Sequence, residues 1–308
     1  MSATTPPPAR TRTRAASRGA WSKLRGSDKA TVLGMSALPV LLVGLLVWLP
    51  ALITVVLSFT RWDGIGGLED IEFIGLRNYT EMATIYPAFW PALWHNLLWL
   101  AGLFLVFTPL GMLLAILLDR ELRGTTFYQT ALYLPVVLST ALIGFIWQLM
   151  YSADQGFINA VLGTSIDFYG DPGINLYAAM LANGWRHTGY IMLLYLAGLK
   201  GFDKELHEAS ALDGAGPIKT FFLITFPVMR PTNILILVIT FIEGLRAFDL
   251  VWVINRGTNG LEMISTLVTA NVAGEASRIG FGSALATVML LLSSVFIIIQ
   301  TRLNMKDS

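Results

Sequence analysis

Six long apolar segments alternate with shorter polar ones along the chain. Each covers about 20 residues or more, enough to cross roughly 30 Å of hydrocarbon as an α-helix rising about 1.5 Å per residue. The segments are residues 31–57, 97–118, 128–151, 174–199, 233–254 and 280–299. The pattern predicts an all-α, polytopic membrane protein with six transmembrane helices and both termini on the same side.

The composition agrees with a membrane protein and excludes several kinds of site. Of the 308 residues, 55% are hydrophobic and 13% charged, whereas soluble domains carry roughly 25% charged residues. The chain has no cysteine, which excludes disulfides and thiolate metal ligands. Its three histidines, His95, His187 and His207, show no paired spacing, so we expect no metal site and no catalytic residues.

The distribution of basic residues predicts the orientation in the membrane. Residues 1–29 hold seven basic residues and one acid, with much Pro, Ser and Thr, a composition typical of a disordered tail. The side that holds this tail carries 15 of the 21 lysines and arginines, and the positive-inside rule places it in the cytoplasm. We expect a cytoplasmic tail over 1–29, a membrane domain over 30–305 and a cytoplasmic end over 306–308.

The polar segment 200–231, between the fourth and fifth predicted spans, has the pattern of two short helices. Leu206, Ala209 and Leu212 share one side of the first helix, and Asp213-Gly214 interrupts its periodicity. Pro217 suits the first position of a second helix. One face of that helix would hold Ile218, Phe221, Phe222 and Thr225, and Pro227 and Pro231 are expected to close the unit.

This segment resembles the signature loop of the membrane subunits of binding-protein-dependent ABC importers. Their consensus is Glu-Ala-Ala, three residues, Gly, nine residues, then Ile-x-Leu-Pro. Here Glu208-Ala209-Ser210, Gly214 and Ile224-Thr225-Phe226-Pro227 match both spacings, with Ser210 and Phe226 as the departures. The resemblance implies a coupling-helix pair that docks on a cytoplasmic ATPase. The coupling residues would be Glu208, Ala209, Ser210, Asp213, Gly214, Ala215, Phe221, Ile224 and Pro227.

Further motifs resemble the sugar-type, maltose permease-like members of that family, in their order. They include Gly75-Leu76-Arg77-Asn78-Tyr79, Phe89-Trp90-Pro91-Ala92-Leu93 and Gly144-Phe145-Ile146-Trp147. The resemblance covers nearly all of residues 30–305. It implies a cell-membrane permease with ATPase subunits that bind ATP and Mg, a second homologous permease and an extracytoplasmic solute-binding protein as partners. The chain has no phosphate-binding loop of the Gly-x-x-x-x-Gly-Lys-Ser/Thr type, so ATP hydrolysis is expected on another subunit.

Polar residues inside the predicted spans are the candidates for a transport pathway, because charges there are costly. In the fourth span, Asn183, Arg186, His187 and Tyr190 share one helical face. In the fifth, Glu243, Arg246 and Asp249 are spaced by three, a spacing at which Arg246 could reach either acid within its own helix. For His187 we expect a hydrogen-bonded packing role. The predicted pathway residues are Asn183, Trp185, Arg186, Tyr190, Glu243, Arg246 and Phe248.

Two readings of these charged groups stay open at this point. They could line a hydrated cavity that binds sugar hydroxyls, or form an ion-pair network that only fixes helix packing. The favoured function is import of a sugar or oligosaccharide by alternating access. Alternatives are a polyol or glycerol phosphate as cargo, or a membrane-embedded lipid-modifying enzyme, although no nucleophile–base or paired-carboxylate constellation is visible.

Overall fold

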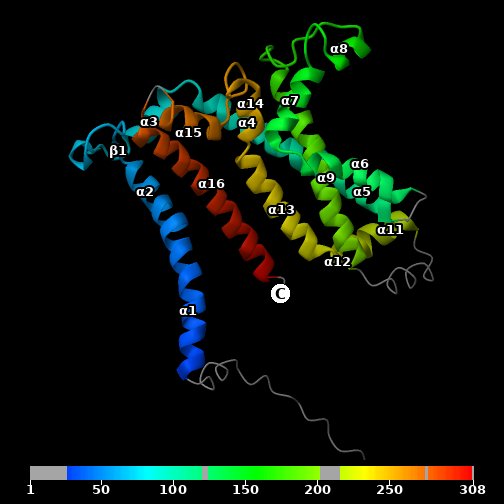
Figure 1. Ribbon diagram of the computed structural model, residues 1–308, viewed down its shortest axis with the longest axis horizontal. Helices are drawn as coiled ribbons and strands as arrows, with labels where there is room; N and C mark the ends of the chain where they lie inside the picture. Colours follow the sequence, from blue (N-terminus) through cyan, green and yellow to red (C-terminus); the bar gives the residue numbers. More distant parts are fainter. Residues whose placement is uncertain (1–25, 120–123, 202–215, 275–276, 307–308) are drawn as a thin grey trace, which may run out of the picture. The chain divides into compact units, whose positions relative to one another are not determined.

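The computed structural model describes residues 26–119, 124–201, 216–274 and 277–306. Most of these residues are helical (Figure 1). Strands β1 (Thr60–Arg61) and β2 (Glu72–Phe73) form one antiparallel pair, with Arg61 opposite Glu72. The predicted all-α class is confirmed. The chain divides into two compact units, residues 1–53 and 54–308, which are described separately.

The first unit contains the beginning of the first predicted span. Helix α1 (Gly26–Val43) continues through the π-helical turn η3 (Gly44–Trp48) into α2 (Leu49–Leu57). Its large apolar side chains are exposed, as for Leu46 (71%) and Trp48 (66%). An apolar helix with exposed side chains all round suits contact with lipid.

The second unit holds the remaining helices. They are η4 (Leu68–Asp70), α3 (Arg77–Thr84), α4 (Phe89–Gly102), η5 (Leu103–Phe107), α5 (Thr108–Asp119), α6 (Thr125–Val137), α7 (Thr140–Met150), α8 (Phe157–Leu162), α9 (Asn175–Lys200), α11 (Pro217–Thr220), η6 (Phe221–Thr225), α12 (Phe226–Val228), α13 (Arg230–Leu245), α14 (Asp249–Asn255), α15 (Ile264–Val272) and α16 (Ile279–Lys306).

All six predicted spans fall on helices, but not all of them are single, continuous apolar helices. Among the described residues, Gly26–Leu57, Phe89–Asp119 and Ile279–Leu303 are long and apolar enough to cross a membrane, and the pair α6–α7 would make a fourth span. Helix α9 has 26 residues and carries the polar face of the fourth segment. Helix α13 has 16 residues, about 24 Å, shorter than the hydrocarbon core.

The third predicted span is broken, contrary to the expectation of one helix over 128–151. Helices α6 and α7 meet at an angle of 104°. Leu138 is extended, and the Ser139 hydroxyl caps α7 by accepting a hydrogen bond from the Leu142 amide at 3.3 Å. A side-chain cap satisfies one of the amides that a new helix leaves unpaired, so the cap stabilises the start of α7 at the bend.

The fifth predicted span is also interrupted. Helix α13 ends at Leu245 and the chain resumes helix at Asp249. The Asn96 side-chain amide donates to the carbonyls of Gly244 and Leu245, at 3.3 and 3.4 Å, and thereby serves carbonyls that a helix end leaves without backbone partners. The prediction that Glu243, Arg246 and Asp249 share one helix is therefore wrong.

The described part of the predicted coupling unit begins at Gly216. Pro217 starts α11, as predicted. The expectation that Pro227 and Pro231 close the unit is wrong, because they occupy the first turns of α12 and α13, where proline fits without losing a helical hydrogen bond. Glu208, Ala209, Ser210, Asp213, Gly214 and Ala215 lie outside the described residues.

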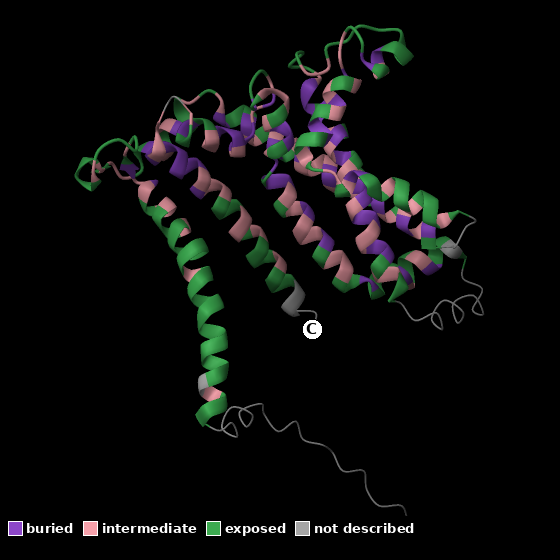
Figure 2. Ribbon diagram, viewed as in Figure 1, coloured by how far each residue is buried: buried purple, intermediate pink, exposed green. Residues whose placement is uncertain are grey.

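Helix α9 lies at the centre of the packing within residues 54–308. It contacts α5, α6 and α13, and buried positions follow most of its length, whereas the second half of α16 is largely exposed (Figure 2). Its contact with α5 is close at Gly111, where an added Cβ would stand 2.9 Å from the Ile191 Cβ and from the Thr188 carbonyl oxygen. Small residues at such crossings let membrane helices approach.

We expect Gly111→Val to destabilise the protein, because backbone and a branched side chain leave no room for new atoms. Overpacking of this kind costs about 1–3 kcal/mol. Thermal unfolding of the purified protein in detergent, followed by size-exclusion chromatography, would measure the loss. Gly34→Val is the matched control, since nothing lies within 4 Å of a Cβ at Gly34; equal melting of the two variants would contradict the close contact.

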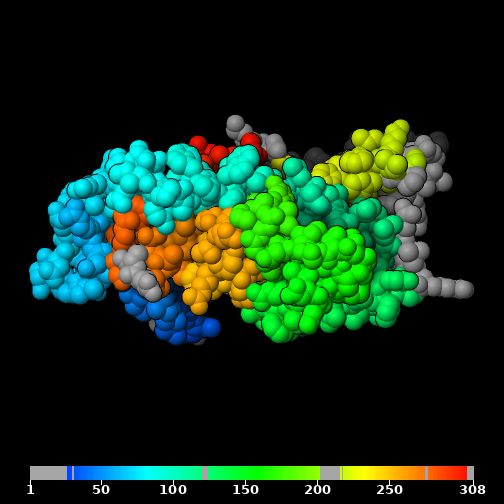
Figure 3. All heavy atoms as spheres, turned by 90° about the horizontal axis from the view of Figure 1, so that it is seen from above, coloured from blue at the N-terminus to red at the C-terminus, as the bar shows by residue number. Residues whose placement is uncertain are grey.

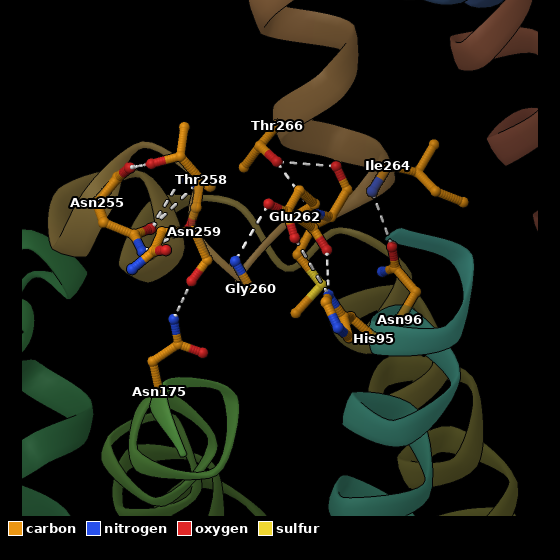
Figure 4. Close-up of polar contacts among 12 residues, drawn as sticks. His95, Asn96, Asn175, Asn255, Thr258, Asn259, Gly260, Glu262, Ile264 and Thr266 are labelled. Carbon is orange, nitrogen blue, oxygen red and sulfur yellow. Dashed lines mark hydrogen bonds and ion pairs between the residues drawn. The ribbon is translucent and has the colours of Figure 1, made fainter. Parts of the chain in front are cut away.

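The connection between α14 and α15 is held by side chains from two other helices (Figure 4). His95 Nδ1 lies 2.9 Å from the Glu262 carbonyl oxygen, and the Ile264 amide donates to Asn96 Oδ1 at 2.9 Å. Asn175 donates to the Asn259 carbonyl at 2.6 Å. These bonds tie the connection to α4 and α9.

Candidate functional site

A cavity of about 220 Å³ lies at the break between α13 and α14. Its wall comes from that break and from α4, α7 and α9. The side chains of Asn183 and Arg186 reach it from α9, and those of Trp99 and Thr140 from α4 and α7. Around the break it is lined by Glu243, Arg246, Phe248 and Asp249, together with neighbouring apolar residues. The interruption of the fifth span and the bend of the third thus place helix ends around one polar space.

Glu243 is the centre of the charged contacts at this cavity. Its Oε1 lies 3.5 Å from Arg186 Nη2, and its Oε2 lies 2.9 Å from His187 Nδ1. About 31% of the Glu243 side chain and 28% of the Arg186 side chain is exposed. The carboxylate therefore joins α13 to α9 while it still faces the cavity.

His187 fixes the inner side of this carboxylate. Its side chain is fully buried. Because a carboxylate only accepts hydrogen bonds, His187 Nδ1–H donates to Glu243. The other ring nitrogen, Nε2, lies 3.2 Å from the Thr108 hydroxyl oxygen, within hydrogen-bonding distance. The expected hydrogen-bonded packing role of His187 agrees with this arrangement.

Thr108 and Thr240 complete the network and were missed by sequence reasoning. Their hydroxyl oxygens are 3.5 Å apart, and Thr240 is fully buried. Thr108 follows the π-helical turn η5, and such turns often occur at functional sites. A lone Thr in an apolar run is a weak signal, because its hydroxyl usually bonds to the carbonyl of its own preceding turn.

The structure separates the predicted pathway residues. Asn183, Arg186, Glu243, Arg246 and Phe248 line the cavity. Trp185 instead borders an apolar pocket of about 440 Å³, with its ring 6.0 Å from that of Trp147. Tyr190 packs against the apolar cluster around Ile191 and Met192. Only part of the predicted set therefore faces one space.

Beyond the break, the cavity wall combines exposed charges with aromatic rings. Arg246 and Asp249 are exposed, and Asp249 lies in the first turn of α14, where a negative charge suits the helix dipole. Phe248 stacks on Trp252 with ring centres 5.2 Å apart. The four charged residues of the wall, two arginines and two acids, have no net formal charge. In the described ranges no group of three or more His, Cys, Asp or Glu is placed to hold a metal ion.

The described part of the predicted coupling unit exposes a second, apolar surface. Ile218 (76%), Phe222 (64%) and Leu223 (65%) are exposed, whereas Thr225 is buried and Phe221 and Ile224 are half-buried. The predicted face of Ile218, Phe221, Phe222 and Thr225 is therefore split between surface and interior, because η6 is π-helical and turns the side chains differently from an α-helix.

Comparison with known proteins identifies similar permeases. The chain is 31% identical to an arabinooligosaccharides transport system permease protein of Bacillus subtilis over 94% of this chain and 93% of the relative. It is 29% identical to a trehalose/maltose transport system permease protein of Thermococcus litoralis, over 85% and 93%. Its fold resembles a solved bacterial alginate ABC transporter in complex with an alginate pentasaccharide-bound periplasmic protein (TM-score 0.74, 20% identity, 89% and 93% covered).

The family comparison covers almost the whole chain. Residues 29–306 match the family described as binding-protein-dependent transport system inner membrane components. Members of this family are multi-pass permease subunits of ABC transporters and not enzymes, which confirms the resemblance seen in the sequence. The chain belongs to the binding-protein-dependent transport system inner membrane components.

Proposed function

We propose that this permease moves a neutral sugar or oligosaccharide into the cytoplasm, and that the cavity around Glu243 lies on its path. The observation that carries the proposal is the pairing of hydrogen-bonding charges with aromatic rings on one wall. Carboxylate and guanidinium groups bond hydroxyls, and Phe248 stacked on Trp252 offers an apolar surface to a sugar ring. The relatives that carry arabinooligosaccharides and trehalose or maltose support the same cargo class.

The charge balance of the wall favours a neutral cargo over an anionic one. Arg186 and Arg246 are matched by Glu243 and Asp249, so an anion would meet no excess of positive charge. A glycerol phosphate would have no counterion for its own charge in this cavity, and burying an unpaired charge costs much free energy. A polyol stays compatible with the wall, and uptake assays with labelled sugars and polyols distinguish the two.

The partners follow from the family and from the exposed coupling surface. We infer that the termini and residues 200–231 face the cytoplasm, where Ile218, Phe222 and Leu223 meet an ATPase subunit that binds ATP and Mg. A second, homologous permease would complete the pathway, and a solute-binding protein would deliver cargo on the opposite side. Closure of the ATPase subunits would move the coupling unit and open the cavity alternately to each side.

Purification of the complex from native membranes tests this function. A nucleotide hydrolase and a second permease are expected to co-purify with the chain. Vesicles that contain the complex should accumulate labelled oligosaccharide only when ATP is present on the side of the coupling unit and binding protein is present on the opposite side of the membrane. Accumulation without ATP, or a purified complex without any hydrolase, would contradict the proposal.

A further inference from the structure

Another cavity adjoins the one at Glu243. It has a volume of about 380 Å³ and lies where the break between α13 and α14 meets α15 and α16; we call it the α15 cavity. Arg246, Phe248 and Asp249 line both cavities, so the break forms a wall that the two spaces share. In Figure 1 and Figure 3, α14 and α15 lie side by side at one end of residues 54–308. The polar space at the break therefore continues beyond the candidate site.

Helix α15 is anchored on one side and contributes a mixed surface to the cavity. Ile264 and Leu267 are buried in an apolar cluster with residues of α16. Ser265, Val268 and Thr269, spaced as neighbours on a helix surface, line the α15 cavity. The packing of α15 on α16 thus presents two hydroxyl groups and one apolar side chain to this space.

The two hydroxyl groups are positioned by the backbone and keep acceptor capacity. The Ser265 hydroxyl donates to the Ala247 carbonyl at 2.6 Å, which ties α15 to the break. The Thr269 hydroxyl donates to the Ser265 carbonyl at 3.2 Å. A hydroxyl has one hydrogen to donate and two lone pairs, so both groups can still accept hydrogen bonds from a ligand.

The charged groups on the shared wall complement these acceptors. Arg246 and Asp249 are exposed, and neither forms a salt bridge with another described residue. Arg246 supplies N–H donors and Asp249 supplies acceptors, and their formal charges cancel. The wall therefore suits a neutral ligand that both donates and accepts hydrogen bonds.

The cavity at Glu243 is small for a ligand site by itself. Its volume of about 220 Å³ lies below the roughly 300–1,000 Å³ of ordinary ligand sites, whereas the two adjoining cavities together fall within that range. A cargo that fills both spaces would use the whole polar region around the break.

The apolar part of the wall fits the faces of a sugar ring. Phe248, on the shared wall, stacks on Trp252, and Val268, Ala286 and Met289 add apolar surface to the α15 cavity. A sugar ring has hydroxyls around its edge and apolar faces, so it matches both kinds of group. A lipid acyl chain in the same place would cover Arg246 and Asp249 with hydrocarbon, which is costly.

We propose that the α15 cavity is a second sugar subsite, and that a cargo of two or more rings spans the break, with one ring at Glu243 and the next at Thr269. This inference rests on the proposed function, since it extends the cargo cavity named there. Arg246 and Asp249 bond hydroxyls of either ring. A single-ring sugar or a polyol fills one cavity only, so the cargo class narrows to oligosaccharides.

Protection of an introduced thiol tests the subsite at the permease itself, because the chain contains no cysteine. Thr269→Cys reports on the α15 cavity and Asn183→Cys on the cavity at Glu243. The complete transporter in nanodiscs, with binding protein and a non-hydrolysable ATP analogue, is treated with a charged methanethiosulfonate, and mass spectrometry of the chain gives the labelling rate. The probes are maltotriose, arabinotriose and trehalose, with glucose and arabinose as single-ring sugars.

At roughly ten times its half-saturating concentration, a multi-ring sugar that the wild type accumulates should slow labelling of both variants roughly tenfold, because only the unoccupied fraction reacts. The single-ring sugars should leave labelling of Thr269→Cys unchanged. Ala270→Cys is the matched control, since Ala270 is exposed on the same helix but does not line the cavity; its labelling should not respond to sugar. Melting temperatures near that of the wild type check that the variants fold.

Protection of Asn183→Cys without protection of Thr269→Cys would overturn the second subsite and leave the proposed function standing. Equal protection of Thr269→Cys and Ala270→Cys would indicate general shielding and also overturn it. A Thr269→Cys thiol that does not react even without sugar would assign the cavity to another occupant, a lipid if the thiol reacts in detergent and the second permease if it does not. If the wild type accumulates none of the sugars, the proposed function fails, and the subsite with it.

Discussion

Replacing Glu243 with glutamine is expected to lower ATP-dependent uptake roughly tenfold or more and to destabilise the protein. Arg186 Nη2 lies 3.5 Å from the Glu243 carboxylate, and a neutral amide in its place cannot balance the charge of Arg186. Losing one partner of a fully buried pair costs about 3–5 kcal/mol; we expect about 2–3 kcal/mol here, because both side chains are partly exposed. About 1.4 kcal/mol corresponds to a factor of ten. Uptake into proteoliposomes and thermal unfolding in detergent measure the two effects.

The double variant Arg186→Gln, Glu243→Gln separates the two readings of this network. It removes both charges, so stability should recover toward the wild type in either case. If the groups only fix helix packing, uptake should recover as well. If they bind cargo, uptake should stay low and the KM should rise, which is the result we expect.

Two further variants control this experiment. His187→Gln keeps one donor and one acceptor toward Glu243 and Thr108 and should retain more uptake than His187→Leu, which keeps neither. Asp154→Asn makes the same carboxylate-to-amide change at an exposed residue and should leave uptake unchanged. Normal uptake and an unchanged melting temperature for Glu243→Gln would rule out a central role for the carboxylate.

Changing Glu208 and Gly214 together should reduce ATP-coupled uptake to near background. Both belong to the signature loop, and the proposed function makes this loop the rigid link through which the ATPase moves the membrane helices. In Glu208→Arg, Gly214→Val, the reversed charge and the branched side chain would change the docked surface and the turn. Uptake, together with co-purification of the ATPase, shows whether coupling or only assembly is lost.

Lys219→Gln is the control for the coupling variant. Lys219 is exposed in α11, in the same polar segment but outside the signature residues, so its replacement should leave uptake close to the wild type. Full uptake in the Glu208 and Gly214 double variant would discard the coupling assignment.

The apolar pattern predicted where helices occur but not where they break. The third segment is mainly apolar from 128 to 151. At the 104° bend, Leu138–Ser139, the only polar residues in the sequence are one serine and one threonine. In the fifth segment the helix ends at Leu245, where Asn96, about 150 positions earlier, bonds to its last carbonyls. Such a stop depends on a distant side chain, so local periodicity carries no trace of it.

The candidate site shows the same division. Helical spacing placed Asn183 and Arg186 on one face, and both line the cavity. Spacing also suggested that Arg246 pairs with an acid of its own helix. In the structure, Glu243 of α13 instead contacts Arg186 and His187 of α9. The side chains of Trp185 and Tyr190 leave α9 in other directions and pack against other neighbours, so they do not line the cavity. The coupling residues between 202 and 215 stay a prediction from their motif.

By itself, the sequence determined that this chain is an all-α membrane permease of the ABC importer family, because the cost of burying polar backbone in hydrocarbon leaves helices as the spanning element and the signature spacing is local. The tertiary structure decided which polar groups meet. Hydrophobicity acts on each residue separately, whereas the contacts of Glu243 with His187 and of Asn96 with Leu245 need distances between segments far apart in the chain. Only packing sets those distances.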